Sequence, residues 1–388
     1  MTIPLADDEL ARLTALRRDL HAHPELGFEE ERTASIVAER LAAAGIAVTR
    51  GLGRTGVVGT LTTGPGRAVA LRADMDALAM PEVGTPPWAS TVPGRMHACG
   101  HDGHTTMLLG AAERLARARD FTGTVHFVFQ PAEEGRGGAK AMVEDGFFER
   151  FPVDAAYGLH NMPGLPVDRI AAVPGPQLAS SDSWEVVFTG RGSHGAKPHQ
   201  GRDAVTAAGH FLTQLSIVTA RRVDPLEPAV VSACALEAGD FAALNVIPET
   251  VRVGGTARAY SAPVRDLLEE EIGRLAQGVA ASFGIRADYT FRRRIPPVVN
   301  EPACTDIARA AIAAALGPDA VVPAFPPSTA GDDFAEFSAR VPGAYVWLGN
   351  GPAEEGALHH NGRYDFNDAA IPAGVRFWEE VVRAELAR

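Results

Sequence analysis

The chain has 388 residues, of which 46% are hydrophobic, and it carries a formal net charge of −12 at pH 7. This length corresponds to about two or three domains, and the apolar fraction is ordinary for a globular protein with a sizeable core. Because nucleic-acid phosphates need a basic surface, the acidic balance argues against nucleic acid as a partner.

The cysteines and the N-terminal segment indicate the cellular compartment. Cys99, Cys234 and Cys304 are too few and too scattered for a disulfide framework. Residues 1–18 lack the apolar segment of a signal peptide, and no stretch approaches the roughly 18 apolar residues of a membrane span. We therefore expect a soluble cytoplasmic protein without a membrane partner.

Helices and short strands alternate along the first part of the chain. Apolar residues at helical spacing, short apolar runs and period-two alternation predict helices over 7–20, 30–44 and 103–119, and strands over 46–50, 56–61, 67–73, 124–130 and 155–160. Pro24 and Gly27 end the first helix. His21 and His23 lie just before them, and we interpret both as residues that hydrogen-bond the backbone rather than as metal ligands.

The stretch from Met96 to His104 is unusually rich in potential metal ligands. It holds three histidines, one cysteine and one aspartate, with glycines between them that allow the backbone to turn tightly. Cys99 and His101, two residues apart, can bind one soft or borderline divalent cation. Taken alone, the stretch is also compatible with a polar surface loop and a cysteine that packs in the core.

Further candidate ligands follow the predicted strands. Asp76 comes just after one strand, Glu133 and Glu134 follow another, and His160 ends a third. Asp76 is equally compatible with a functional carboxylate and with the cap of a solvated turn. The two glutamates offer one carboxylate to hold a cation and one to move protons, although an isolated acidic pair is often an exposed turn. The recurrence of acid or imidazole at strand ends predicts a shared metal site.

The pattern changes at about residue 179. Predicted elements over 179–292 follow the order β-α-β-β-α-β, which is typical of a compact, ferredoxin-like α+β module. The α/β pattern then resumes with helices over 303–316 and 369–387. We therefore expect an α/β domain with a mixed sheet, formed by 1–178 and 293–388, that is interrupted by a smaller domain at 179–292.

The candidate ligands are more numerous than one metal ion needs. They are Cys99, His101, Glu134, His160 and His359, with Glu133 beside them. One catalytic zinc ion takes three protein ligands and water, whereas this set suits two ions about 3.5–4 Å apart with a water or hydroxide between them. A thiolate ligand favours zinc, cobalt or nickel, and manganese stays compatible.

Motifs along most of the chain resemble those of one enzyme family. They are HPELGFEE (23–30), RADMDAL (72–78), HACGHDGHTTMLLGAA (97–112), QPAEEG (130–135), GLHN (158–161), GSHGAKPHQGRDA (192–204), NVIPE (245–249), GTAR (255–258) and LHHN with YDFND (358–368). Together they resemble the M20 metallopeptidases, and within them the amidohydrolases that cleave N-acyl amino acids, hippurate and auxin conjugates. The resemblance runs from about residue 10 to the end of the chain.

The resemblance implies a dinuclear catalytic domain and a smaller lid domain that often dimerises. It assigns metal ligation to Cys99, His101, Glu134, His160 and His359. It makes Glu133 the general base, which takes a proton from water and delivers it to the leaving amine. Asp76 falls where the family has an acid behind the metal site.

The resemblance also implies roles for the lid. His194 would polarise the scissile carbonyl or steady the oxyanion, while Asn245 and Arg258 would hold the carboxylate of the substrate. The run from His359 to Asn361 departs from the family, which leaves open whether His359 or His360 ligates, and His359 is preferred.

The sequence thus predicts a homodimeric amidohydrolase that uses two divalent metal ions, with zinc expected first and manganese, cobalt or nickel as alternatives. Its substrate would be an N-acyl amino acid or a short peptide. A dipeptidase or aminopeptidase with the same site is one alternative. A metal-binding protein without activity is another, but such a protein has no use for a proton-transferring Glu133 next to Glu134.

Overall fold

The computed structural model describes residues 5–353 and 358–387. The chain divides into two compact units. The larger unit comprises Met1–Gly175, Val299–Pro326 and Asp333–Arg388, and the inserted unit comprises Pro176–Val298 and Pro327–Asp332.

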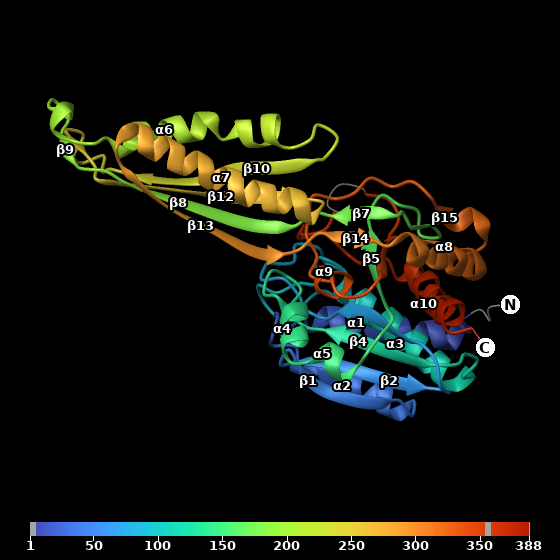
Figure 1. Ribbon diagram of the computed structural model, residues 1–388. Coiled ribbons are helices and arrows are strands. Elements are labelled where there is room, and N and C mark those ends of the chain that lie inside the picture. The colour runs from blue at the N-terminus through green and yellow to red at the C-terminus, as the bar shows by residue number, and fades with distance from the viewer. Residues whose placement is uncertain (1–4, 354–357, 388) are drawn as a thin grey trace. The chain divides into compact units, whose positions relative to one another are not determined.

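The larger unit is an α/β domain built on one sheet (Figure 1). Its helices are α1 (Asp7–Ala22), α2 (Glu31–Ala43), α3 (His101–Ala118), α4 (Gly138–Glu144), α5 (Phe147–Arg150), α8 (Pro302–Leu316), α9 (Ala335–Ser338) and α10 (Ile371–Glu385), with short turns η3 (Pro318–Ala320) and η4 (Asp368–Ala370). Its strands are β1 (Ala47–Leu52), β2 (Gly56–Thr62), β3 (Ala68–Asp74), β4 (Thr124–Gln130), β5 (Ala155–Met162), β6 (Ile170–Ala171), β15 (Val321–Val322) and β16 (Gly343–Gly349).

The strands form an eight-stranded mixed sheet in the order β1-β2-β4-β3-β5-β16-β6-β15. Strand β3 pairs in parallel with β4 and β5, and β5 pairs in parallel with β16. These central strands are buried along nearly their whole length, which explains why they read as apolar runs rather than as a clean alternation. Helix α3 packs against α1, α2, α10 and β3 in the main hydrophobic core.

Strand direction brings the candidate ligands to one edge of the sheet. Because β3, β4 and β5 are parallel, their carboxyl ends meet at the same edge, where Asp74 of β3 lies opposite Gln130 of β4. His160 near the end of β5 lies opposite Trp347 of β16. The segments that follow β3 and β4 therefore emerge beside His160.

The inserted unit is a separate α+β module with its own core. Its elements are β8 (Ser181–Thr189), β9 (Ser193–His194), η1 (Pro198–Gln200), α6 (Ala204–Gln214), η2 (Val218–Arg222), β10 (Ala229–Ala238), β11 (Val246–Ile247), β12 (Thr250–Ala259), α7 (Ala262–Phe283) and β13 (Arg286–Ile295). Where the chain passes from one unit to the other, β7 (Gly175–Leu178) and β14 (Val298–Asn300) form a two-stranded sheet.

Four antiparallel strands of this unit form a sheet in the order β10-β12-β8-β13, with α6 and α7 over one face (Figure 1). With α6 and α7 as the crossovers, the chain order is β-α-β-β-α-β, so the predicted ferredoxin-like module and the mixed α/β fold class are confirmed. No helix within the described residues has the length and apolar character needed to cross a membrane.

Candidate metal centre

A glycine sets the geometry of the Cys99–His101 segment. Gly100 adopts a left-handed φ of 95° immediately before α3. A Cβ atom at this position would lie 2.4 Å from Asn161 Oδ1 and 2.7 Å from the Tyr364 hydroxyl, so a larger residue cannot fit without displacement. The tight turn leaves Cys99 in the loop and His101 as the first residue of α3, with Cys99 Sγ 3.4 Å from His160 Nε2.

Potential donor atoms form five groups among the described residues, and two of these groups share Cys99. One group is Cys99, His101 and His160, and the other is Cys99, Glu134 and His360. The donor atoms of each group lie within 4.8 Å of one another. In the second group, His360 Nε2 is 3.2 Å from Glu134 Oε1. Two groups of soft and borderline donors that share one thiol fit a pair of divalent cations.

The hydrogen bonds around these groups test that fit. His160 Nδ1 lies 2.8 Å from the carbonyl oxygen of Asn161. Because a carbonyl oxygen can only accept, the proton of His160 is on Nδ1, and the lone pair of Nε2 is directed toward Cys99. Burial and the neighbouring His104 hold the pKa of His160 well below its usual range, so this ring is neutral, as a ligand must be. Within the described chain, both His101 ring nitrogens and Glu134 Oε1 are buried and make no hydrogen bond of good geometry, although Asp76 lies 3.3 Å from His101 Nδ1 and His360 lies 3.2 Å from Glu134 Oε1.

The pKa shifts of Cys99 and His101 also favour a bound cation. Burial and the negative charge of Glu134 raise the pKa of Cys99, so a thiolate there needs positive charge nearby. Burial alone would lower the pKa of His101, but the charge of Asp74 and contacts with Asp76 and Cys99 raise it well above its usual range. The site therefore favours added positive charge, which bound metal ions would supply.

Asp76 orients the glutamate pair. Its Oδ1 accepts a hydrogen bond of 3.0 Å from the backbone N–H of Glu133, and its Oδ2 accepts one of 2.9 Å from that of Glu134. Asp76 Oδ1 also lies 3.3 Å from His101 Nδ1. Asp76 is almost fully buried, so it is a structural link between two ligand-bearing segments rather than the cap of a solvated turn.

A buried chain of polar side chains supports the donor groups. Asp74 Oδ1 lies 2.6 Å from His104 Nδ1, and His104 Nε2 lies 2.8 Å from Asn161 Oδ1. Asn161 Nδ2 in turn lies 2.5 Å from the Tyr364 hydroxyl and 3.1 Å from His359 Nε2. This series of hydrogen bonds connects β3, α3, β5 and the segment that follows β16.

The adjacent histidines of that segment have different partners. The sequence favoured His359 as the last ligand, but its Nε2 is directed to Asn161. His360 is the residue whose imidazole lies beside Cys99 and Glu134. The backbone explains the difference, because His360 has a left-handed φ of 59° and its N–H donates to the carbonyl of Ala98 at 2.8 Å.

The histidines at the end of α1 also differ from each other. His23 Nδ1 lies 2.8 Å from the carbonyl oxygen of Asp19, so its predicted backbone hydrogen bond is confirmed. For His21 the prediction was wrong: Nδ1 lies 2.8 Å from Asp102 Oδ2 and Nε2 lies 3.3 Å from Glu82 Oε1. Burial opposes charge on this ring, but Asp102 and Glu82 raise the pKa of His21 to about 10. Sequence periodicity could not reveal a partner so far along the chain.

Comparison with known proteins decides the family. The model of the peptidase family M20/M25/M40 matches residues 70–384. The chain belongs to this family. The hippurate hydrolase of Campylobacter jejuni is 38% identical over 98% of this chain and 98% of its own. The N-acetylcysteine deacetylase of Bacillus subtilis is 36% identical over 95% of this chain and 96% of its own.

A solved structure extends the M20 assignment to the fold and the cofactor. A Bacillus subtilis protein described as a dinuclear metal-binding peptidase of family M20 is 34% identical to this chain. It aligns with a TM-score of 0.87 over 98% of this chain and 99% of that one. This M20 protein is therefore a metal-dependent amide hydrolase, and its donor groups fit two divalent cations.

In the inserted unit of this M20 protein, the predicted oxyanion-stabilising residue His194 and the predicted substrate-binding residue Asn245 lie on two paired segments. His194 of β9 pairs with Val246 of β11, and the N–H of Gly195 donates to the carbonyl of Asn245 at 2.7 Å. Both His194 and Asn245 are exposed. The N–H of Ala196 donates to His194 Nδ1 at 3.0 Å, so a neutral His194 carries its proton on Nε2 and can donate there.

The second predicted substrate-binding residue, Arg258, lies on β12 and is half-buried. Its Nη1 donates to the carbonyl of Ala257 at 2.9 Å and to the hydroxyl of Thr256. Within the described chain, its Nε and Nη2 donate to no protein acceptor, so both can bind a ligand.

Several supporting residues of this M20 site were not assigned from the sequence. Asp102, His104 and Asn161 stood inside motifs that carried the resemblance, yet only their neighbours received a role. Their function depends on partners far away in the sequence, as the bond between His104 and Asn161 shows. The recognisable signal was the motif itself, in which polar residues flank each candidate ligand.

Proposed function

We propose that this protein hydrolyses the amide bond of N-acyl amino acids, with two divalent cations held by Cys99, His101, Glu134, His160 and His360. The observation that carries the proposal is the pair of donor groups that share Cys99, with Glu133 beside them. Hippurate and N-acetylcysteine, named in two relatives of similar length, are both N-acyl amino acids. The likeness to both favours an amino acid on the leaving side of the bond.

In this proposal, Glu133 is the general base. Bound cations would supply the Lewis acidity that makes water a nucleophile at neutral pH and polarises the scissile carbonyl. Glu133 is only 8% exposed, and its carboxylate lies with His101 and Glu134 in another group of potential donors. From there it would take a proton from the attacking water and deliver it to the leaving amine. The bond from its N–H to Asp76 holds it in place.

We infer that the last metal ligand is His360 instead of His359. Three features support this choice: the short distance to Glu134, the membership of the Cys99 group, and the separate bond of His359 to Asn161. His359 then becomes a residue that contacts His160, with ring centroids 4.9 Å apart, and helps to orient it.

The inserted unit would supply the groups that hold the substrate. A neutral His194 offers an Nε2–H donor for the oxygen that becomes negative in the transition state. Arg258 offers Nε and Nη2, which match a carboxylate, and Asn245 offers an exposed amide. These roles are those of a lid domain, and they agree with a substrate that carries a free carboxylate.

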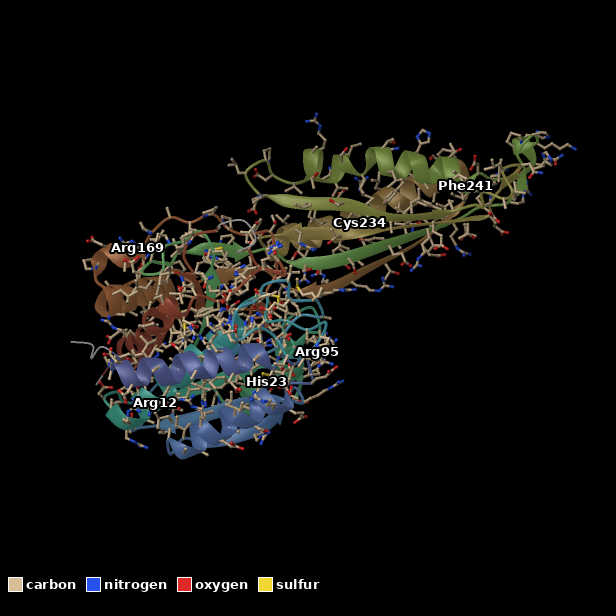
Figure 2. All side chains as sticks on the ribbon, turned by 180° about the vertical axis from the view of Figure 1, so that it is seen from behind. Arg12, His23, Arg95, Arg169, Cys234 and Phe241 are labelled. Atoms are coloured by element: carbon tan, nitrogen blue, oxygen red, sulfur yellow. The ribbon has the colours of Figure 1, made fainter. Side chains whose placement is uncertain are left out.

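We also propose a homodimer through the inserted unit. Strand β10 is an edge strand with a free row of backbone groups, and apolar side chains on it are exposed, with Leu236 at 59%. Phe241, in the segment after β10, is 94% exposed; Figure 2 shows it together with Cys234 of β10. Light scattering should give twice the chain mass for the native protein and a reduced mass for Leu236→Lys. Val83→Lys, at an apolar residue of the larger unit that is 53% exposed, is the matched control.

The function is tested by metal analysis together with a substrate panel. The purified protein should contain about two metal ions per chain and release the free amino acid from N-benzoyl and N-acetyl amino acids. Chelator should abolish the release, and Glu133→Gln should lower its rate by about 10²–10⁴-fold without loss of metal. Faster cleavage of dipeptides would favour the peptidase alternative, and no cleavage with metal bound would favour a binding protein. Zinc as the native metal and a cytoplasmic location stay predictions from the sequence.

A further inference from the structure

Two glutamates of the HPELGFEE motif have separate tasks. The carboxylate of Glu25 caps α2, because its oxygens accept from the N–H groups of Arg32 at 2.9 Å and Thr33 at 2.8 Å. Glu30 directly precedes α2, yet its side chain makes no cap bond to this helix. The Glu30 carboxylate is fully buried and turns instead toward the loop that carries Glu133.

The contacts of Glu30 are specific. Its Oε1 accepts a hydrogen bond of 2.8 Å from the backbone N–H of Ala132, and its Oε2 accepts one of 2.6 Å from the hydroxyl of Thr55. Burial raises the pKa of Glu30 to about 7, the Thr55 bond opposes this rise, and the charge of Asp76 adds to it. Oε1 can accept from Ala132 in both protonation states, because only one carboxyl oxygen carries a proton.

The loop after β4 depends on such acceptors. Three consecutive N–H groups point to buried carboxylates: Ala132 donates to Glu30, and both Glu133 and Glu134 donate to Asp76. Ala132 has a left-handed φ of 54°, which is uncommon for a residue with a Cβ atom. The turn persists because the surrounding bonds determine it, and it sets the direction in which the Glu133 and Glu134 side chains leave the backbone.

Backbone packing reinforces the contact. A Cβ atom on Gly27 would lie 2.9 Å from the Cα atom of Ala132, so the motif and the loop touch directly. The carbonyl of Gly27 also accepts from Arg136 Nη1 at 2.9 Å. Residues 25–30 therefore pack against the loop that carries Glu133 and Glu134, and they contribute no donor atom to the groups of potential metal ligands.

We propose that Glu30 is a positioning residue for amide hydrolysis, which fixes Ala132 and thereby aims Glu133 at the attacking water. This inference rests on the proposed function of Glu133. In this proposal, the rate of hydrolysis depends on a side-chain acceptor that reaches the N–H of Ala132, and not on the negative charge of Glu30. Charge and distance can be separated, because Gln keeps the length and the acceptor, Asp keeps the charge but is shorter, and Leu removes both.

The test compares Glu30→Gln, Glu30→Asp and Glu30→Leu in the full-length protein. Glu30→Leu and Glu30→Asp should lower kcat by roughly 10–100-fold with KM and metal content nearly unchanged, because a small misplacement of a catalytic group costs rate rather than binding. Glu30→Gln should keep kcat within about threefold of the native value. Glu31→Leu, at the exposed next residue, is the matched control and should behave as native protein.

A second readout is independent of activity. Hydrogen exchange followed by mass spectrometry should show faster exchange over residues 131–135 in Glu30→Asp and Glu30→Leu, but not in Glu30→Gln, both as purified and after chelator treatment. If Glu30→Leu does not fold, the comparison of Glu30→Asp with Glu30→Gln alone tests whether the position of the acceptor sets kcat and the exchange rate. Native kcat in Glu30→Asp, or unchanged exchange in both shortened variants, would overturn the proposal. If native protein cleaves no N-acyl amino acid, the proposed function fails, and the exchange data alone decide whether Glu30 holds the loop.

Discussion

Both units contain buried ion pairs, as Arg265 with Asp182 shows for the inserted unit, but the two candidate sites differ in the burial of their polar groups. In the larger unit, Arg72 and Asp74 are almost fully buried and bind each other at 2.7 Å behind the candidate ligands. In the inserted unit, Arg252 and Glu185 pair at the surface of the sheet, and His194 is exposed. A buried charge cannot move without losing partners that water does not replace, whereas a surface pair contributes little. The fold therefore holds the candidate metal ligands firmly and leaves the candidate substrate groups accessible.

This contrast separates variants into two classes. Changes at donors of the larger unit should alter metal content or proton transfer, because the donor atoms of each group lie within 4.8 Å of one another. Changes at His194, Asn245 or Arg258 should alter turnover or substrate binding and leave the metal in place.

The largest effect is expected at Glu133. In Glu133→Gln the side chain keeps its size but cannot accept the proton, so kcat should fall by about 10²–10⁴-fold. Metal content, measured by mass spectrometry, should be the same as in native protein. Glu144→Gln, at an exposed residue of α4, serves as the control. A fully active Glu133→Gln variant would remove Glu133 from the mechanism.

The paired histidines test the ligand assignment. His360→Ala should lose about one metal ion per chain and most of the activity, because it removes the imidazole beside Cys99 and Glu134. His359→Ala should retain about two ions per chain, since its Nε2 is bound to Asn161. The reverse pattern of metal contents would restore His359 as the ligand.

The candidate site was predictable where local sequence determines geometry. The spacing of Cys99 and His101 around a glycine, and the position of His160 at a strand end, follow from short-range rules. The proposed choice of His360 over His359 was not predictable, because it rests on the left-handed backbone of His360 and on its bond to Ala98.

The same distinction applies to the fold. Alternating helices and strands indicate a mixed α/β domain with an inserted module, because helical spacing, period-two alternation and short apolar runs mark the main elements locally. Residues that act through distant partners give no such signal. His21 bonds Asp102, and Glu30 bonds Ala132, across 81 and 102 positions of the sequence respectively. Periodicity and propensity describe neighbours along the chain and contain no information on such pairs.

His194 provides the contrasting test in the inserted unit. His194→Ala removes the Nε2–H donor, and loss of one oxyanion donor typically lowers kcat by about 10²–10³-fold. Metal content should not change, because the residue lies outside every donor group of the described chain. His199→Ala, at a neighbouring exposed histidine, is the control. Loss of metal in His194→Ala would show that the residue is a ligand.

The smallest effect concerns the dependence of stability on pH. Burial raises the pKa of Glu30 from an ordinary 4.5 to about 7, with the charge of Asp76 adding to the shift. Between these values the folded protein keeps a proton that the unfolded chain has released, so the free energy of unfolding falls as pH rises through this window. Glu30→Gln removes this titration. The free energy of unfolding of the variant, relative to that of the native protein, should therefore rise by at most about 3 kcal/mol from low to neutral pH. Urea unfolding of both proteins between about pH 5 and pH 8 measures the difference, with Glu31→Gln as control. Parallel stability curves for native protein and Glu30→Gln would show that Glu30 is already ionised in the folded state at pH 5, and that its two hydrogen bonds outweigh the cost of its burial.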